Sequence, residues 1–269
     1  MLGVNLSPRP GIRRGALWLG LRAAFVIGAL ATASSAHAEF KLRYPTVDYR
    51  ELEFEHNGDT TFDKRKSGKS NNQSYTNEIE AGVTPFWTFG LEAESGAASG
   101  ENLRYDATTV ENIFQLTPQG KYWADLGFFA EYSHAASRAG ADSFTFGPLI
   151  QKELPDIPAI GSVHTLNLLF GKEVGRNRSD ATPAFFAWQS RLRVHPLFEP
   201  GIEVYSQIAD VESPGKLADQ QHRIGPMFAG IYSLAPYGEI KYEAGYLVGL
   251  TRATEKGAVR WRFEYEIPF

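Results

Sequence analysis

Apolar and polar residues alternate with a period of two along most of the chain. The final stretch, 259–269, shows this most clearly, because its odd positions are all apolar and its even positions are charged up to Pro268. Successive side chains of a strand point to opposite faces, so this stretch predicts a strand with one aromatic face and one charged face. The same alternation predicts about twelve strands, centred on 52–54, 75–83, 87–93, 110–114, 126–128, 144–146, 166–168, 186–194, 202–208, 224–228, 240–248 and 259–269.

Two kinds of connection separate these strands. Short connections that contain Pro occur at 84–86, 117–120, 154–158, 196–201 and 234–238. Polar and often longer connections occur at 57–72, 96–106, 135–142, 172–182, 209–220 and 250–257. The two kinds alternate, so one edge of the sheet carries turns and the other carries loops. This asymmetry predicts an all-β, transmembrane, antiparallel up-and-down β-barrel with short periplasmic turns and longer extracellular loops.

A soluble β-sandwich is the alternative fold, because its strands alternate in the same way. Two features favour the barrel. Aromatic residues of the apolar face lie near strand ends, as in an interfacial girdle: Trp87, Tyr122, Tyr232 and Phe269. The opposite faces carry too many charges for a packed core, since an unpaired buried charge is costly.

The N-terminus has the pattern of a secretory signal. Arg9, Arg13 and Arg14 precede an apolar run at 23–31, and the small residues Ala36 and Ala38 fit a cleavage site. A single anchor helix is the alternative, although Arg22 leaves an apolar run shorter than a bilayer span. We therefore expect a removed signal peptide, 1–38, and a barrel domain, 39–269. Removing the signal, which holds four Arg and no acid, moves the net charge from −4 to −8.

The last strand resembles the C-terminal signature of Gram-negative outer-membrane barrels. The match rests on the alternation of 259–269 and on the terminal aromatic Phe269. The resemblance implies an outer-membrane location, lipid and lipopolysaccharide as surroundings, and recruitment of the barrel-assembly machinery by Phe269. Pro268 departs from the pattern by removing one N–H from the ladder, which a strand end tolerates.

The parity of each strand predicts which charges face the lumen. The first strands supply an acidic arc: Glu51, Glu53, Glu55, Glu78, Glu80, Glu92, Glu94 and Glu111, with Asp125 and Glu131. The last strands supply a basic-leaning arc: Arg191, Arg193, Arg223, Lys241, Arg260 and Arg262. Closing the barrel should bring the first strand beside the last one. We therefore expect an ion-pair ladder in which Glu51, Glu53 and Glu55 lie near Arg260 and Arg262.

These arcs predict a narrow channel for passive passage of small polar or cationic solutes, because a pore lined by acids favours cations. The alternative is a structural or adhesion barrel whose lumen is plugged by its own charge network. Twelve strands lie between filled eight-stranded barrels and open porins, so the count does not decide. The surplus of acid favours water in the lumen, because surplus buried charge needs hydration.

Other functions find less support in the residues. An outer-membrane lipid-modifying enzyme is a third candidate, but His134 would point opposite to both Ser133 and Ser137, so we expect no enzyme. The chain has no Cys, no His pair with metal-ligand spacing and no phosphate loop, so we expect no cofactor or metal. An acidic exported chain is a poor nucleic-acid ligand. The basic run 64–69 is a candidate lipopolysaccharide contact or a solvated charge run.

Overall fold

The computed structural model of the protein describes residues 40–63, 71–155 and 160–269. In these ranges the chain is almost entirely β-structure, with one short 3-10 turn, η1 (Leu217–Asp219). The strands are β1 (Glu51–Phe62), β2 (Gln73–Thr84), β3 (Trp87–Ala97), β4 (Arg104–Gln115), β5 (Asp125–Ala135), β6 (Asp142–Leu154), β7 (Ser162–Val174), β8 (Ala184–Leu192), β9 (Glu199–Ile208), β10 (Gln221–Ser233), β11 (Glu239–Gly249) and β12 (Gly257–Pro268).

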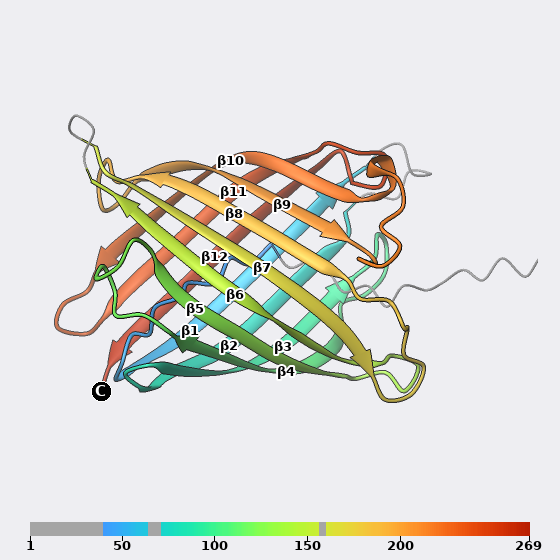
Figure 1. Ribbon diagram of the computed structural model, residues 1–269, viewed down its shortest axis with the longest axis horizontal. Helices are drawn as coiled ribbons and strands as arrows, with labels where there is room; N and C mark the ends of the chain where they lie inside the picture. Colours follow the sequence, from blue (N-terminus) through green and yellow to red (C-terminus); the bar gives the residue numbers. More distant parts are fainter. Residues whose placement is uncertain (1–39, 64–70, 156–159) are drawn as a thin grey trace, which may run out of the picture. The chain divides into compact units, whose positions relative to one another are not determined.

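Each strand pairs antiparallel with its neighbour in sequence, and β1 pairs with β12 to close the barrel (Figure 1). Closure leaves no unpaired sheet edge. The predicted antiparallel up-and-down barrel of about twelve strands is confirmed. The alternative of two packed sheets is wrong, because one continuous sheet closes on itself.

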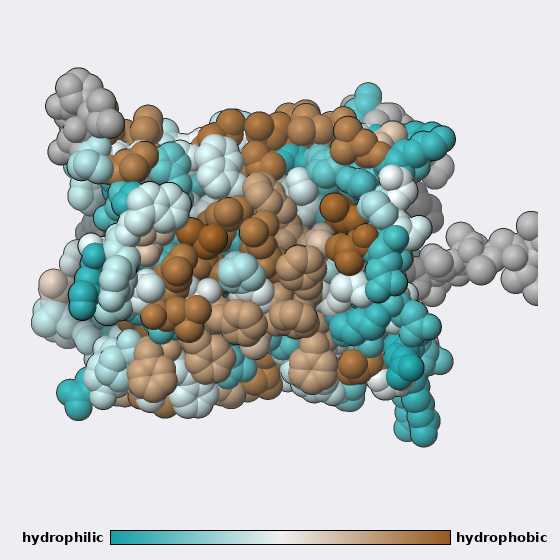
Figure 2. Space-filling model, in the orientation of Figure 1, coloured by the Kyte–Doolittle hydropathy of each residue, from teal (hydrophilic) through white to brown (hydrophobic). Residues whose placement is uncertain are grey.

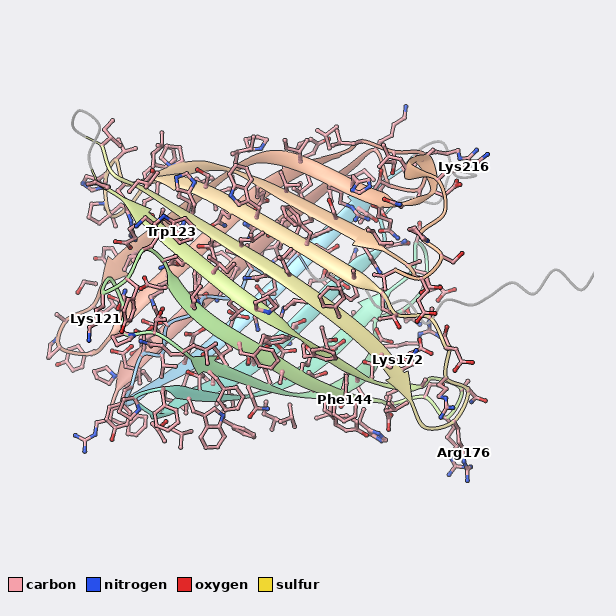
Figure 3. The ribbon with its side chains drawn as sticks, in the orientation of Figure 1. Lys121, Trp123, Phe144, Lys172, Arg176 and Lys216 are labelled. Carbon is pink, nitrogen blue, oxygen red and sulfur yellow. The ribbon has the colours of Figure 1, made fainter. Side chains whose placement is uncertain are left out.

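The outer surface of the barrel is apolar in the middle and polar at the ends. Figure 2 shows a broad hydrophobic band across the visible face, with hydrophilic residues gathered at its ends. Side chains of outward parity supply the band, among them Phe54, Ile79, Phe89, Leu91, Phe128, Phe144, Phe146, Phe170, Phe228, Tyr246 and Phe263. Figure 3 labels Phe144 on this band, while Lys172, Arg176 and Lys216 lie at one end and Lys121 and Trp123 at the other.

The two ends of the barrel differ in their connections. At the end that holds the start of β1 and the end of β12, called the turn end below, β2 passes into β3 through 85–86 alone. The opposite end, called the loop end, carries the connections 63–72, 175–183 and 209–220. One turn-end connection, 116–124, is longer than the loop-end connections 98–103 and 136–141, so the contrast in length is not strict.

Two features of the sequence lie outside the described residues. These are the signal segment 1–38 and the basic run 64–69. Within the described ranges, no helix has both the length and the hydropathy to cross a bilayer.

Candidate functional site

Residues 40–48 lie inside the barrel and are called the lumen segment below. They belong to no strand, and they lead at the turn end into β1. Inward side chains from β1 to β5 contact one side of the segment, and those from β8 to β12 contact the other. The sequence pattern predicted β1 but not a segment that enters the lumen before it.

The ammonium of Lys41 lies among four carboxylates of the acidic arc. Its Nζ is 2.7 Å from Glu92, 3.0 Å from Glu55 and 3.5 Å from Glu111, and it also bonds Glu78. Lysine and carboxylates are all buried, at 5% exposure or less. Burial by itself would lower the pKa of Lys41, but the surrounding carboxylates, led by Glu111, raise that pKa well above its ordinary value. The lumen segment therefore carries a fixed positive charge into the acidic arc.

Arg43 extends the same contact one step along the acidic arc. Its Nη2 lies 2.9 Å from Glu111 and 3.1 Å from Glu131, and its guanidinium carbon lies 4.2 Å from the ring centre of Phe129. Asn167 fixes the backbone at this point, since its side chain accepts from Arg43 N at 2.7 Å and donates to Arg43 O at 2.8 Å. Lys41 and Arg43 thus both face the acidic arc.

The alternate residues of the segment face the opposite wall. Phe40 meets Tyr205 with ring centres 5.4 Å apart, and the Tyr205 hydroxyl donates to Phe40 O at 3.2 Å. The guanidinium of Arg223 lies 5.0 Å from the Phe40 ring centre, a cation–π contact of about 0.5–2 kcal/mol. The buried cluster on this side is Phe40, Leu42, Ala187, Tyr205, Leu247 and Ala258.

Tyr44 binds the basic-leaning arc through both its ring and its hydroxyl. The hydroxyl donates to Glu243 at 2.7 Å. The guanidinium carbons of Arg262 and Arg191 lie 5.5 Å and 5.7 Å from the ring centre. Arg262 also donates from Nη1 to Leu42 O at 2.9 Å. The arginines of this arc therefore hold the apolar face of the lumen segment.

The lumen segment and the wall residues beside it bury one another. Leu42 is 1% exposed, and the wall residues Glu111, Gln189 and Glu203 facing this level are at most 1% exposed. These groups are therefore shielded from solvent. Sequence reasoning expected a surplus of unpaired acid and hence water in this region. It missed that Lys41 and Arg43 supply counter-charges from outside the strands.

The basic residues of β12 pair differently from the expected seam ladder. Arg262 lies 2.5 Å from Glu55 of β1, as expected, and also bonds its neighbour Glu264. Arg260 instead pairs with carboxylates of β9 and β11. It donates from Nε to Glu203 at 2.8 Å and from Nη1 to Glu243 at 2.9 Å. The expected Arg260 pairing is wrong because that side chain points across the adjacent β11 to β9.

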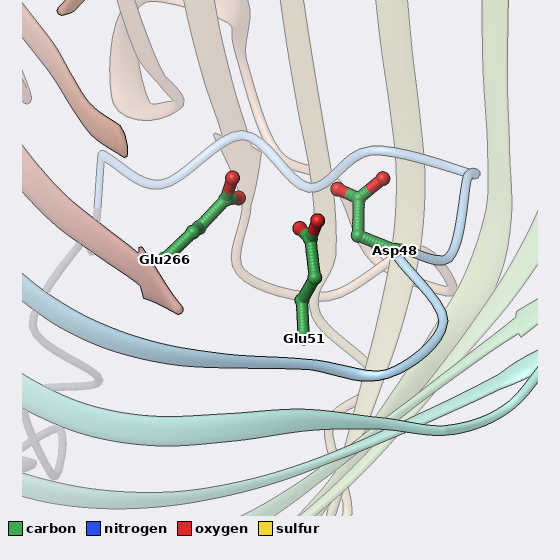
Figure 4. A group of neighbouring side chains, drawn as sticks. All are labelled: Asp48, Glu51 and Glu266. Carbon is green, nitrogen blue, oxygen red and sulfur yellow. The ribbon is translucent and has the colours of Figure 1, made fainter. Parts of the chain in front are cut away.

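An acidic group gathers where β1 begins and β12 ends, formed by Asp48, Glu51 and Glu266 (Figure 4). Lys241 is its counter-charge, since it bonds Glu266 and lies 3.7 Å from Asp48. Glu53 lies opposite Glu266 across the seam. Two further carboxylate groups are close enough to surround an ion: Glu53, Glu264 and Glu266, and Glu78, Glu92 and Glu111. In each of these two groups, at least one carboxylate is paired with a Lys or Arg side chain.

The other predicted lumen residues are spread along the wall. Glu80 and Glu94 are half-buried. Arg191 contacts Glu199 at 3.2 Å. Arg193 follows the end of β8, is exposed, and contacts Glu153 at 2.8 Å. Arg223 contacts the Glu255 carboxylate of the β11–β12 loop, with its Nε 3.0 Å away.

An apolar patch of the lumen was also missed. It is formed by Ile113, Phe129, Leu149 and Leu169, with Phe185 packed against it. All of these side chains have the inward parity of their strands. The signal was the lack of inward charge in β6 and β7, which sequence reasoning interpreted as polar wall alone.

The residues weighed for an enzyme point to different faces. The Ser133 hydroxyl faces the lumen and is bonded to Thr109, with the two oxygen atoms 2.9 Å apart. His134 is exposed on the outside, with its Nδ1 2.9 Å from Asp142. This arrangement contains no Ser–His contact between the two neighbours.

Comparisons with known proteins find similarity at the level of structure only. No family model and no curated protein matches the chain. The chain is similar to the structure of the NanC porin, at 9% identity and a TM-score of 0.48, with 81% of this chain and 100% of that one covered. It is similar to the translocator domain of autotransporter NalP from Neisseria meningitidis, at 11% identity and a TM-score of 0.46, with 81% and 88% covered. A bacterial polysaccharide outer membrane secretin matches at 7% identity and a TM-score of 0.42, with 82% and 99% covered. Likeness at this level says nothing about activity.

Proposed function

We propose that this protein is an outer-membrane channel for small polar or cationic solutes, and that the lumen segment is its gate. The observation that carries this proposal is that a segment outside the strands, rather than wall side chains alone, occupies the lumen. Residues 40–48 contact the wall of the lumen only through non-covalent interactions, and the wall around them is largely polar. A wall lined by carboxylates remains compatible with water and favours cations once such a segment moves aside.

The location follows from the surface of the barrel and from the sequence signals. The apolar outer band fits hydrocarbon, and in a chain of the predicted topology the turn end faces the periplasm. Phe269 is 70% exposed at this end, where the assembly machinery would meet it. A Phe269→Ala variant is therefore expected to reduce the amount of folded barrel in the outer-membrane fraction, measured against the wild-type chain.

Planar-bilayer conductance tests the gate. The double variant Lys41→Ala/Arg43→Ala removes both cations that hold the segment to the acidic arc. We expect rare openings of the wild-type chain, and frequent openings with cation-selective reversal potentials for the double variant. Arg252→Ala, which removes an exposed pair with Asp219, is the control and should behave as wild type.

A plugged structural barrel is the second candidate, and the near-complete burial of Leu42 and Lys41 favours it. The same recordings separate the two candidates. If the double variant folds, as judged by circular dichroism and heat-modifiable electrophoretic mobility, and still conducts no ions, the channel is wrong. The structural role would then stand.

A further inference from the structure

We propose that the carboxylates around Lys41 and Arg43 form a recognition site for a small diamine, which the lumen segment occupies with its own side chains. This inference rests on the proposed channel function and gives it a substrate class. The segment would act as a built-in competitor, and a solute with two ammonium groups would replace it.

The site is built by four consecutive strands that each contribute one carboxylate. Glu55, Glu78, Glu92 and Glu111 come from β1, β2, β3 and β4. Their side chains are 1% exposed, and all four lie within 3.5 Å of one ammonium nitrogen. An ammonium donates three hydrogen bonds, so Lys41 alone does not satisfy four carboxylates. Asn57 and Arg262 also bond Glu55, and Arg43 also bonds Glu111, so the spare acceptor capacity lies in the carboxylate oxygens that these groups do not reach.

Two observations besides the acidity of the cluster indicate a ligand. A cationic group is bound in it, which shows the kind of charge that it accepts. In addition, the Oε1 atoms of Glu78 and Glu111 are buried without a hydrogen-bond partner. Gly90 supplies the room for one of these carboxylates, because a Cβ there would lie 2.1 Å from Glu78 Oε1. A side chain at this position would force the carboxylate to move.

The chemistry of the contacts favours ammonium over other cations. The distances from Lys41 Nζ to Glu92 and Glu55, 2.7 Å and 3.0 Å, are those of charged hydrogen bonds. A quaternary ammonium has no N–H to donate, and a calcium ion would require oxygen ligands at about 2.3–2.6 Å. The carboxylate site therefore favours a cation that donates hydrogen bonds.

Arg43 sets the distance between the two positive charges that the site accepts. Lys41 Nζ and Arg43 Nη2 contact the same atom, Glu111 Oε2, at 3.5 Å and 2.9 Å. The two nitrogen atoms are therefore within the span of a four-carbon diamine. One end of such a solute would take the place of the Lys41 ammonium, and the other would lie between Glu111 and Glu131.

Chemical rescue in the full chain tests the site. Lys41→Ala removes the occupant, and we expect its apparent unfolding temperature in detergent to fall. Butane-1,4-diamine at millimolar concentration should raise that temperature by more than about 2 °C, since a ligand stabilises the state that binds it. The wild-type chain, with its site occupied, should shift much less.

Matched ligands and variants define the specificity. The hexamethyl, doubly quaternary derivative of the same diamine carries equal charge without N–H donors and should give no rescue. Adding Glu92→Gln to Lys41→Ala should abolish rescue. Adding Glu255→Gln, which removes a carboxylate bound to Arg223 outside the site, should preserve it. Lys41→Gln, which keeps most of the side-chain volume, serves the same test if Lys41→Ala does not fold.

The outcomes separate this inference from the channel itself. Absence of rescue in both Lys41 variants, or equal rescue by the quaternary derivative or by Ca²⁺, overturns the diamine site, whether or not the bilayer recordings show conductance. Rescue that depends on Glu92 supports the site even if no variant conducts, in which case the channel function alone fails.

Discussion

At the scale of single residues, the protein places ionisable side chains where they are shielded from water. Removing one partner of a buried ion pair costs about 3–5 kcal/mol, because the remaining charge stays buried. Lys41 is the most connected of these groups in the described part of the lumen, with contacts to carboxylates from four strands. Its loss should therefore cost more than the loss of a charge at the surface.

Lys41→Met keeps the length of the side chain and removes its charge. We expect the free energy of unfolding to fall by about 3–5 kcal/mol, measured by thermal unfolding in detergent. Arg252→Met is the control. Its ion pair with Asp219 is exposed, at 76% and 48% for the two side chains, so its cost should be at most about 1 kcal/mol. Equal effects of the two variants would contradict this account of the lumen.

The pH dependence of this difference has a defined sign. The pKa of Lys41 in the folded chain is raised above its ordinary value of 10.5. The contribution of Lys41 is therefore complete below pH 10.5 and is lost as the pH rises through the folded-state pKa. The difference in unfolding temperature between wild type and Lys41→Met should be constant from pH 7 to about pH 10 and narrow above it. A difference that already narrows near pH 8 would contradict the raised pKa.

Arg262 connects the barrel seam to the lumen segment. It contacts Glu55 across the β1–β12 pairing and donates to Leu42 O. Arg262→Glu would add a carboxylate beside Glu55 and Glu264, so we expect a lower unfolding temperature and more frequent channel opening. Arg104→Glu, which places a carboxylate beside the exposed Glu101, is the comparison and should have a smaller effect. An unchanged unfolding temperature in Arg262→Glu would contradict a stabilising role of Arg262 at the seam.

At the scale of elements, the same period of two serves both the wall and the segment. Along 40–44, apolar residues alternate with Lys41 and Arg43, so an extended segment presents an aromatic face and a basic face. The two faces match the two arcs of the lumen. The strands themselves are interrupted in places, and the β10–β11 register omits Gly225 and Pro226 between Ile224 and Met227.

Gly225→Ala tests whether the close approach of β10 and β11 at this interruption requires a glycine. A Cβ at Gly225 would lie 1.7 Å from the backbone oxygen of Tyr246, so the two strands would have to separate. Overpacking of this kind costs about 1–3 kcal/mol, and we expect a lower unfolding temperature and a smaller folded yield. Gly215→Ala in the β9–β10 loop is the control. It has open space around the new atom but a positive φ, so it should cost about 1–2 kcal/mol and measures backbone strain without overpacking.

At the scale of the whole barrel, the usual arrangement of a soluble protein is inverted. Ionisable side chains lie inside, paired with one another and with the lumen segment, while phenylalanine and aliphatic side chains face outward. This arrangement is stable only where hydrocarbon covers the outer band. A monomeric chain that stays folded in buffer without detergent would contradict the membrane assignment.

The cost of placing a charged residue on the outer band depends on how deep that position lies in the membrane. Phe228 lies in the middle part of β10, and Tyr232 lies near its turn end. We expect Phe228→Arg to cost about 2–4 kcal/mol of unfolding free energy in a bilayer, and Tyr232→Arg about 0–1 kcal/mol. The measurement is reversible unfolding in lipid vesicles. Similar costs at both positions would place the membrane elsewhere on the barrel.

Alternation along the chain was enough to predict about twelve strands and the face on which most of their side chains lie. These properties follow from the two-residue period, because a slip by one position would turn Arg260 and Arg262 toward lipid. The antiparallel order followed from short connections, which can join only neighbouring strands. The acidic and basic arcs could be assigned for the same reason, since parity fixes the side of the sheet.

The filling of the lumen depends on contacts that form only in the folded barrel. The contacts of Lys41 with Glu92 and of Phe40 with Tyr205 join residues far apart in the chain, and no local pattern encodes them. Parity says that Arg260 points inward, but the tilt and closure of the barrel decide that it reaches Glu203 rather than β1. The segment 40–44 carried a signal in its alternating bases. Its place became evident only when the closed wall surrounded it with opposite charge.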